Sequence, residues 1–332
     1  MNKRLAISIL FLVHGLIEAT WVSRIPEIQN KLHADTGALG LALLGSAAGA
    51  ILSMPVTGWL LARRNSRAVT MASVLSHCAV LPLLALADST AMLMAALVVY
   101  GAAGGAADVA INAAGSAVDK EAVRPVMSSF HALYSMGGML GAAAGALAVK
   151  FDAPIAGHFA MAAVVFAIVS MCMAPGLSAA LPEGEAAGAS FALPPRSLLG
   201  LGAIAFCILF GERAMADWTG IYLVGAGATT AFAAYGYAAF SGAMTVGRFA
   251  GDGLIHRFGA MKVVRMGSAI AAAGLAASLA IGAPAAGLLG FAAVGLGYSA
   301  IVPILFRAGG QTLWQASPVV AAAQAAVAFE IP

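Results

Sequence analysis

Long apolar segments follow one another along almost the whole chain of 332 residues, and short polar stretches separate them. A helix needs about 20 apolar residues to cross the hydrocarbon core of a bilayer. Inside lipid a helix satisfies its own backbone polar groups, which an isolated strand does not. The pattern therefore predicts ten membrane-spanning helices. They cover residues 5–26, 37–62, 69–87, 91–118, 128–150, 155–174, 198–224, 231–257, 262–282 and 284–307.

The later part of the chain repeats the plan of the earlier part about 195 positions on. Trp21 and Gly45 correspond to Trp218 and Gly242. Internal repeats of membrane-length segments are typical of secondary transporters. We therefore expect an all-α membrane protein of two pseudo-symmetric halves: a six-helix half at 1–174, a cytoplasmic linker at 175–197 and a second half at 198–332. The second half contains four spans and a stub, so either the chain is truncated relative to this architecture or its last residues pack differently.

Composition and charge support a membrane location and orient the chain. Hydrophobic residues make up 61% of the sequence and charged residues 9%, against about 25% charged in an ordinary soluble domain. Basic loop residues favour the cytoplasmic side, and here twelve lie on the side of the N-terminus and three on the other. We expect a multi-pass protein of a bacterial cytoplasmic (inner) membrane with its N-terminus in the cytoplasm. The twelve are Lys3, Arg4, Arg63, Arg64, Arg67, Lys120, Arg124, Arg196, Arg257, Lys262, Arg265 and Arg307; the three are Arg24, Lys31 and Lys150.

Several other classes of function receive no support from the motifs. The net charge of +3 is explained by the basic residues of the expected cytoplasmic loops, so it does not indicate a nucleic-acid partner. Cys78, Cys172 and Cys207 are far apart in sequence and are interpreted as small buried residues, so we expect no metal and no cofactor. The glycine runs lack a preceding strand, which a nucleotide-binding loop requires, and are interpreted as helix-packing positions. We expect no enzyme activity, a monomer, and lipid as the surrounding partner.

Four stretches of charged, aromatic and glycine residues carry a more specific signal. They are Trp21, Arg24, Ile25, Pro26 and Ile28; Asp108 to Asn112 with Arg124, Pro125 and Met127 to Leu133; Glu212, Asp217, Trp218 and Tyr222; and Gly247, Arg248, Gly251, Asp252, Leu254, Arg257, Phe258 and Gly259. Together they resemble the major facilitator superfamily, and within it a little-characterised bacterial inner-membrane branch near the fucose-permease-like transporters. The resemblance implies twelve helices, of which helices 1, 4, 7 and 10 line a central cavity.

One loop departs from the superfamily pattern. Between the second and third spans Gly58 and Arg63 fit, but Ala62 stands where the family has Asp and Asn65 stands where it has a second Gly. The departure weakens the cytoplasmic latch that the resemblance implies. The residues expected to contribute to gating or to a structural latch are Arg63, Arg248, Asp252 and Arg257.

Carboxylates inside membrane spans are costly and usually mark a substrate or proton pathway. Glu18, Asp108, Glu212 and Asp217 all fall on the helices that the resemblance places around the cavity. Asp108 and Asn112 are four residues apart, so they share a helix face and can present an acceptor and an amide to one polar ligand. Glu18 is expected nearer the outer interface.

The seventh span offers both a structural and a functional interpretation. Arg213 and Asp217 are four residues apart and can form an internal ion pair. Glu212 lies on a different face, where we expect no local cation, and burial there disfavours its charged form. Glu212 is thus the leading proton carrier and Asp108 the next. The sequence favours a secondary transporter of a small polar or amphipathic solute, driven by protons; the alternatives are a truncated, non-transporting fragment and a polytopic membrane enzyme.

Overall fold

The computed structural model describes residues 2–122, 126–178 and 199–305, apart from the side chains at 199 and 252. The regular structure of these residues is helical throughout. The long helices are α1 (Lys3–Val22), α3 (Thr36–Leu61), α4 (Ser66–Val80), α5 (Thr90–Glu121), α6 (Met127–Lys150), α7 (Ile155–Met173), α8 (Leu199–Gly225), α10 (Tyr235–Phe258), α11 (Ala260–Ile281) and α12 (Pro284–Tyr298). Short helices are α2 (Ile25–Leu32), α9 (Thr230–Ala233) and the 3-10 turns η1 (Leu81–Leu86) and η2 (Ala174–Gly176).

Eight helical segments of the described chain are long and apolar enough to cross a membrane, and the protein is a multi-pass membrane protein. The helices α8 and α10 also coincide with predicted spans, but that all ten cross the bilayer stays a prediction. The linker at 175–197 and the stub after 307 lie almost entirely outside the described residues, so both also stay predictions, as does the pseudo-symmetry of the halves.

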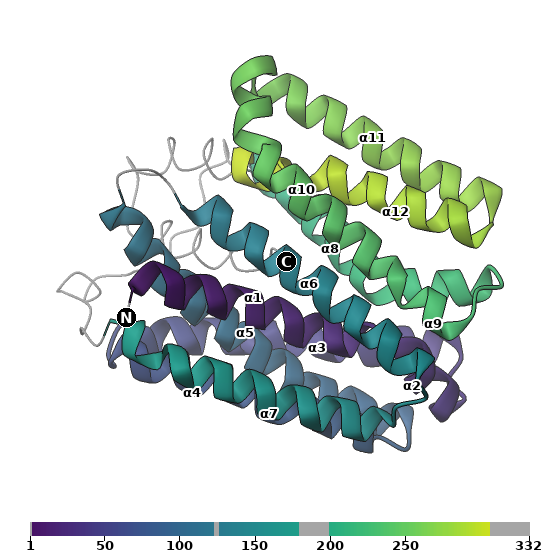
Figure 1. Cartoon of the computed structure of the whole chain (residues 1–332), viewed down its shortest axis with the longest axis horizontal. Helices are drawn as coiled ribbons and strands as arrows, with labels where there is room; N and C mark the ends of the chain where they lie inside the picture. Colours follow the sequence, from purple (N-terminus) through teal and green to yellow (C-terminus); the bar gives the residue numbers. More distant parts are fainter. Residues whose placement is uncertain (1, 123–125, 179–198, 306–332) are drawn as a thin grey trace.

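The sequence sets the helix ends by local capping. The side chain of Asp35 accepts a hydrogen bond from the backbone N–H of Ala38 and starts α3, and Ser89 does the same for α5. The turn between α10 and α11 requires Gly259, whose φ of 79° disfavours residues with a Cβ. These signals keep the inter-helix turns short, so each long helix runs back across the bundle from the one before it (Figure 1). The tightest pairs are α3 with α5, α1 with α6 and α11 with α12.

The helices form two groups that meet along one seam (Figure 1). The N-terminal group consists of α1 and α3–α7, and the C-terminal group of α8 and α10–α12. The closest packing between the groups joins α6 to α10, and α1 and α2 also touch α8. A polar residue on α1, α3 or α6 can therefore face a residue of the C-terminal group.

Small residues allow close helix contacts within the N-terminal group. A Cβ added to Gly101 of α5 would overlap the backbone carbonyl of Ser46 in α3. One added to Gly137 of α6 would overlap the carbonyl of Leu12 in α1. The predicted packing role of these glycines is confirmed, because the backbones of both helix pairs approach too closely for any side chain.

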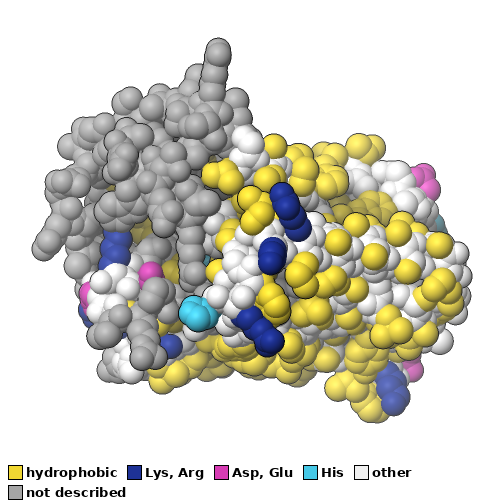
Figure 2. Space-filling view, turned by 90° about the horizontal axis from the view of Figure 1, so that it is seen from above, with side chains coloured by type: hydrophobic (Ala, Val, Ile, Leu, Met, Phe, Trp, Pro, Cys, Tyr) yellow, Lys and Arg dark blue, Asp and Glu magenta, His cyan; other side chains and the backbone are white. Residues whose placement is uncertain are grey.

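Large apolar side chains fill the interior and also cover the outside. Trp21, Tyr100 and Phe130 are among the fully buried side chains of the core. On the face over α10–α12 most side chains are hydrophobic, and Lys and Arg side chains gather mainly toward one side (Figure 2). Cys78 is buried as predicted, but Cys172 and Cys207 are exposed. Their prediction as buried residues was wrong, because the outward faces of membrane helices meet lipid and carry apolar residues too.

Candidate functional site

A cavity of about 310 Å³ lies between the two helix groups. Its walls come from α1, α3, α5 and α6 of the N-terminal group and from α8 and α10 of the C-terminal group. The residues that carry polar groups into it are His14, Glu18, Ser46, Asp108, Tyr134, Arg213 and Tyr237. Apolar side chains, among them Ile51, Phe206 and Phe210, line the remainder.

Arg213 connects the two groups across this cavity. Its Nε lies 3.0 Å from the Asp217 carboxylate on the same helix, which confirms the predicted internal pair. Its Nη1 lies 3.5 Å from Glu18 of α1, and its Nη2 donates a 3.4 Å hydrogen bond to Ser46 of α3. The Arg213 side chain is 37% exposed while Asp217 is 9% exposed. The guanidinium is therefore held by Asp217 and reaches across the cavity to the opposite wall.

Glu18 shares its carboxylate between a cation and an imidazole. One oxygen lies 3.5 Å from Arg213 and the other lies 3.3 Å from Nε2 of His77 in α4. His77 is fully buried, and the Tyr100 ring lies 4.7 Å from its ring. That Glu18 lies nearer the outer interface stays a prediction. The packing of α4 and α8 against α1 places its side chain in the cavity, 13% exposed, among ionisable partners.

Asp108 occupies a separate position on the cavity wall. Nε2 of His14 lies 3.7 Å from its carboxylate, and the amide nitrogen of Asn112 donates a 2.9 Å hydrogen bond to the same oxygen. Asn112 is 2% exposed and does not line the cavity. The two residues share a helix face as predicted, but Asn112 supports Asp108 instead of presenting its own amide to a ligand.

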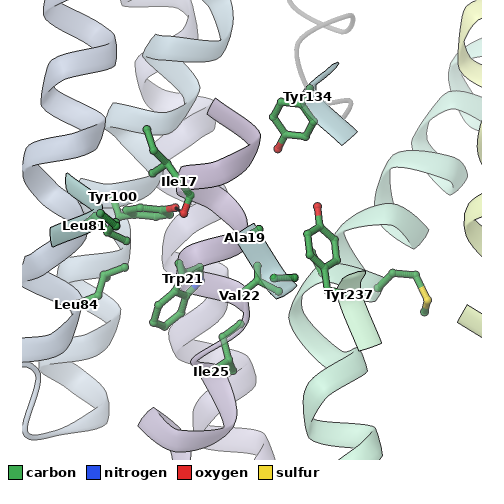
Figure 3. Packing of buried hydrophobic residues seen from close by; sticks show 14 of the residues in the cluster. Ile17, Ala19, Trp21, Val22, Ile25, Leu81, Leu84, Tyr100, Tyr134 and Tyr237 are labelled. Atoms are coloured by element: carbon green, nitrogen blue, oxygen red, sulfur yellow. Dashed lines mark hydrogen bonds between the residues drawn. The ribbon is translucent and has the colours of Figure 1, made fainter. Parts of the chain in front are cut away.

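Two tyrosines mark the seam between the groups. Tyr134 of α6 and Tyr237 of α10 direct their hydroxyl groups toward the same space (Figure 3). Both line the cavity. In the same view Tyr100 lies against α1, where its hydroxyl donates a 3.4 Å hydrogen bond to the carbonyl of Ile17 (Figure 3). Phenol groups on both sides of the seam add donors and acceptors for a polar ligand.

Glu212 lies outside the cavity, in the packed interior between α8 and α10. It is fully buried, and neither carboxylate oxygen has a hydrogen-bond partner among the described residues. The expectation of no nearby cation was wrong, because Arg248 of α10 lies 3.9 Å away. Arg248 also donates hydrogen bonds to the Ser135 hydroxyl and, at 3.1 Å, to the His131 carbonyl of α6. The pair forms only through helix packing, since 36 residues separate its members.

The four residues expected to gate do not form one cluster in the described part of the structure. Arg63 lies over the ring of Trp59 at 4.5 Å, and Arg257 lies over Phe258 at 5.3 Å. Arg248 faces the interior as described above. The side chain of Asp252 lies outside the described residues, so its contribution to a latch stays a prediction.

The ionisable side chains of the site that the sequence analysis did not single out are chiefly histidines. His14 and His77 were missed, although an imidazole inside an apolar span is itself a signal for a functional site. Ser46 was missed because serine is common in membrane helices. His14 stands four residues before Glu18, a spacing that would have placed both on one face of the first span.

Comparisons with known proteins identify the family. The family model described as Major Facilitator Superfamily matches residues 7–328. An uncharacterized MFS-type transporter of Yersinia pestis is 34% identical over 324 residues, covering 97% of this chain and 84% of the relative. An uncharacterized transporter of Sinorhizobium fredii is 33% identical over 302 residues, covering 89% and 79%.

Solved structures show the same fold. The crystal structure of a mutant of the nucleoside transporter NupG superposes with a TM-score of 0.72 at 15% identity, over 99% of this chain and 88% of that one. A bacterial homolog of the human lysosomal transporter Spinster, in an inward-facing and occupied conformation, gives a TM-score of 0.68 at 14% identity, over 98% and 77%. The chain is a membrane transporter that belongs to the Major Facilitator Superfamily.

Proposed function

We propose that this protein is a secondary active transporter that moves a small polar or amphipathic solute across the cytoplasmic membrane by alternating access, coupled to protons. The observation that carries the proposal is the cavity between the two helix groups, into which both groups direct charged side chains. Glu18 and Asp108 come from the N-terminal group, and Arg213 comes from the C-terminal group. A solute bound there touches both groups, so its binding energy depends on their relative position.

The lining supports a solute with both polar and apolar surface. Carboxylate, guanidinium, hydroxyl and imidazole groups offer donors and acceptors at several points around the cavity. Phe206 and Phe210 of α8 add an aromatic wall on one side. Small-molecule sites are typically of this kind, with mostly apolar walls and a few placed polar groups. The chemical identity of the solute and the direction of its movement require a substrate screen.

Glu212 supports the proton coupling. Its carboxylate is fully buried, receives no hydrogen bond from the described residues and faces a single guanidinium at 3.9 Å. A buried charge with so little compensation is costly, and uptake of a proton removes that cost. Because Glu212 lies on α8, one residue before Arg213, a movement of α8 during transport alters the surroundings of both residues.

The test uses purified protein in proteoliposomes with an imposed pH gradient. A panel of small polar solutes is first screened for accumulation. For a solute that accumulates, we expect Glu212→Gln to abolish uphill transport and to leave exchange of the same solute across the membrane largely intact, since Gln keeps the size but not the titration. The matched control is Glu121→Gln, an exposed glutamate that pairs with Lys3, which should transport normally.

Two results would contradict the proposal. Accumulation of no solute in the panel by a correctly folded protein would count against transport of this class. Normal uphill transport by Glu212→Gln would refute Glu212 as the proton carrier, and Asp108 would then be tested in the same pair of assays.

A further inference from the structure

A second set of ionisable groups lies inside the N-terminal helix group, apart from Glu212. His77 is fully buried, and its Nε2 lies 3.3 Å from a carboxylate oxygen of Glu18. Its Nδ1 has no hydrogen-bond partner among the described residues. A buried polar nitrogen without a partner is uncommon in a protein core, and it indicates a role beyond packing.

We propose that His77 and Glu18 form a second proton-binding site, and that the proton bound there decides whether Glu18 holds Arg213 of the opposite helix group. The proposal does not rest on the role assigned to Glu212. It assigns a function to a histidine on α4, a helix that contributes no residue to the cavity lining.

Few ionisable groups surround His77. From α1 it faces Glu18 and the ring of His14, whose centroid lies 5.2 Å away, and from α5 it faces Tyr100. The other elements packed against α4 contribute little: α3 and η1 contain no ionisable residue, and α7 contains only His158 and Cys172. His158 accepts a 3.2 Å hydrogen bond from Arg24 instead. On α4 itself the other ionisable groups are Arg67, which donates to the Leu177 carbonyl, and Cys78.

A glycine of α5 leaves room for His77 and Glu18 to lie next to each other. Both face Gly104 of α5: a Cβ there would lie 3.2 Å from Nε2 of His77 and 3.4 Å from Oε1 of Glu18. Any larger residue at this position would press on both groups. The absence of a side chain on α5 thus leaves the imidazole and the carboxylate adjacent to each other.

Protonation of His77 would change the ion-pair partner of Glu18. A neutral His77 leaves the Glu18 charge to Arg213, which bridges the two helix groups at 3.5 Å. A protonated His77 takes Glu18 as its own ion-pair partner and adds a like charge near Arg213, so the bridge weakens. Arg213 is then retained on α8 by Asp217 at 3.0 Å. A histidine suits this switch, because imidazole exists in a neutral and a charged form and an adjacent carboxylate favours the charged one.

The predicted outcome is a pH-dependent separation of the helix groups. Glu18 lies near the end of α1, which packs against α6, and Arg213 lies in the middle of α8. We therefore expect loss of their bridge to separate the two groups at the ends where α6 and α11 finish. Phe151, directly after α6, is 74% exposed and Ile281, the last residue of α11, is 65% exposed. Both positions accept a label without disturbing the interior.

The experiment measures the distance between spin labels at Phe151→Cys and Ile281→Cys by pulsed electron paramagnetic resonance. The full chain, with its native cysteines replaced by serine, is placed in lipid nanodiscs and titrated from about pH 5 to 8. With native His77 we expect a longer mean distance at low pH. His77→Gln should keep the short distance at every pH, because Glu18 always holds Arg213. Glu18→Gln should show the opposite, a long distance at every pH.

Control variants separate this site from other groups. His158→Gln, a change in another buried histidine, and Glu212→Gln should both keep the native titration. The inference is overturned if the native distance does not change with pH, if His77→Gln titrates like the native protein, or if His14→Gln or Glu212→Gln alone removes the response. If His77→Gln does not fold, a pH-dependent distance in Glu18→Gln would overturn it. The transport assay of Glu212→Gln tests the proposed function, and the distance measurement tests the His77–Glu18 site. A negative result in one assay therefore does not contradict the other proposal.

Discussion

The ion pair between Glu212 and Arg248 allows a quantitative test of the interior packing. Both side chains are nearly or fully buried, at 0% and 3% exposure, and the charged atoms lie 3.9 Å apart. At an effective dielectric constant of about 20 the attraction between two unit charges at this distance is about 4 kcal/mol. Replacement of Arg248 by Met keeps the length of the side chain but leaves Glu212 buried without its cation. At alkaline pH, where the carboxylate is ionised, such a loss of one partner typically costs about 3–5 kcal/mol.

The double variant isolates the charge effect. Glu212→Gln with Arg248→Met leaves no buried charge at this place, so we expect it to recover at least about 2 kcal/mol relative to Arg248→Met alone. Arg248→Met also removes the hydrogen bond to Ser135, and hydrogen bonds to charged groups contribute about 1.5–3 kcal/mol. Ser135→Ala measures that contribution separately.

The assay is the free energy of unfolding in mixed micelles with increasing denaturing detergent, followed by loss of helical circular dichroism. The four proteins of the cycle, native, two single variants and the double variant, are compared under one condition. If the effects of the single variants simply add in the double variant, Glu212 and Arg248 do not interact, and the packing of α8 against α10 described here is incorrect at this position.

Three further predictions address topology, packing and the cavity. In sealed cells an impermeant thiol reagent should label a cysteine at Lys150 and spare one at Arg64; labelling of Arg64→Cys would reverse the orientation. Gly101→Ala should cost about 1–3 kcal/mol of unfolding free energy, because its Cβ overlaps the backbone of α3, whereas Gly58→Ala, with open space around it, should be neutral or stabilising. Asp108→Asn should weaken solute binding several-fold in exchange assays; unchanged apparent affinity would remove Asp108 from the site.

Local spacing in the sequence predicted what one helix determines by itself. The Arg213–Asp217 pair follows from a separation of four residues, which brings two side chains together on any α-helix. The positions of the long helices follow from the lengths of the apolar segments. The family itself could be identified from charged and glycine residues at the helix ends.

What the sequence did not predict depends on how helices rotate against their neighbours. Glu212 meets Arg248 because a particular face of α10 turns toward α8, and no local pattern encodes that rotation. Glu18 meets His77 because α4 packs against α1 and α5, and no spacing within the first span predicts that contact. The sequence does hold a signal for His77, because an ionisable imidazole within an apolar span is itself unusual.

The arrangement of α8 relates the two proposed proton sites. Glu212 and Arg213 are consecutive, so their side chains leave the helix about 100° apart. One therefore faces Arg248 in the C-terminal group and the other faces Glu18 in the N-terminal group. The Arg213–Glu18 bridge joins the two helix groups, whereas the Glu212–Arg248 contact lies within the C-terminal group. Protonation at the His77–Glu18 site therefore releases α8 from the N-terminal group, while protonation of Glu212 removes an ion pair between α8 and α10, so the two sites act on α8 through different contacts.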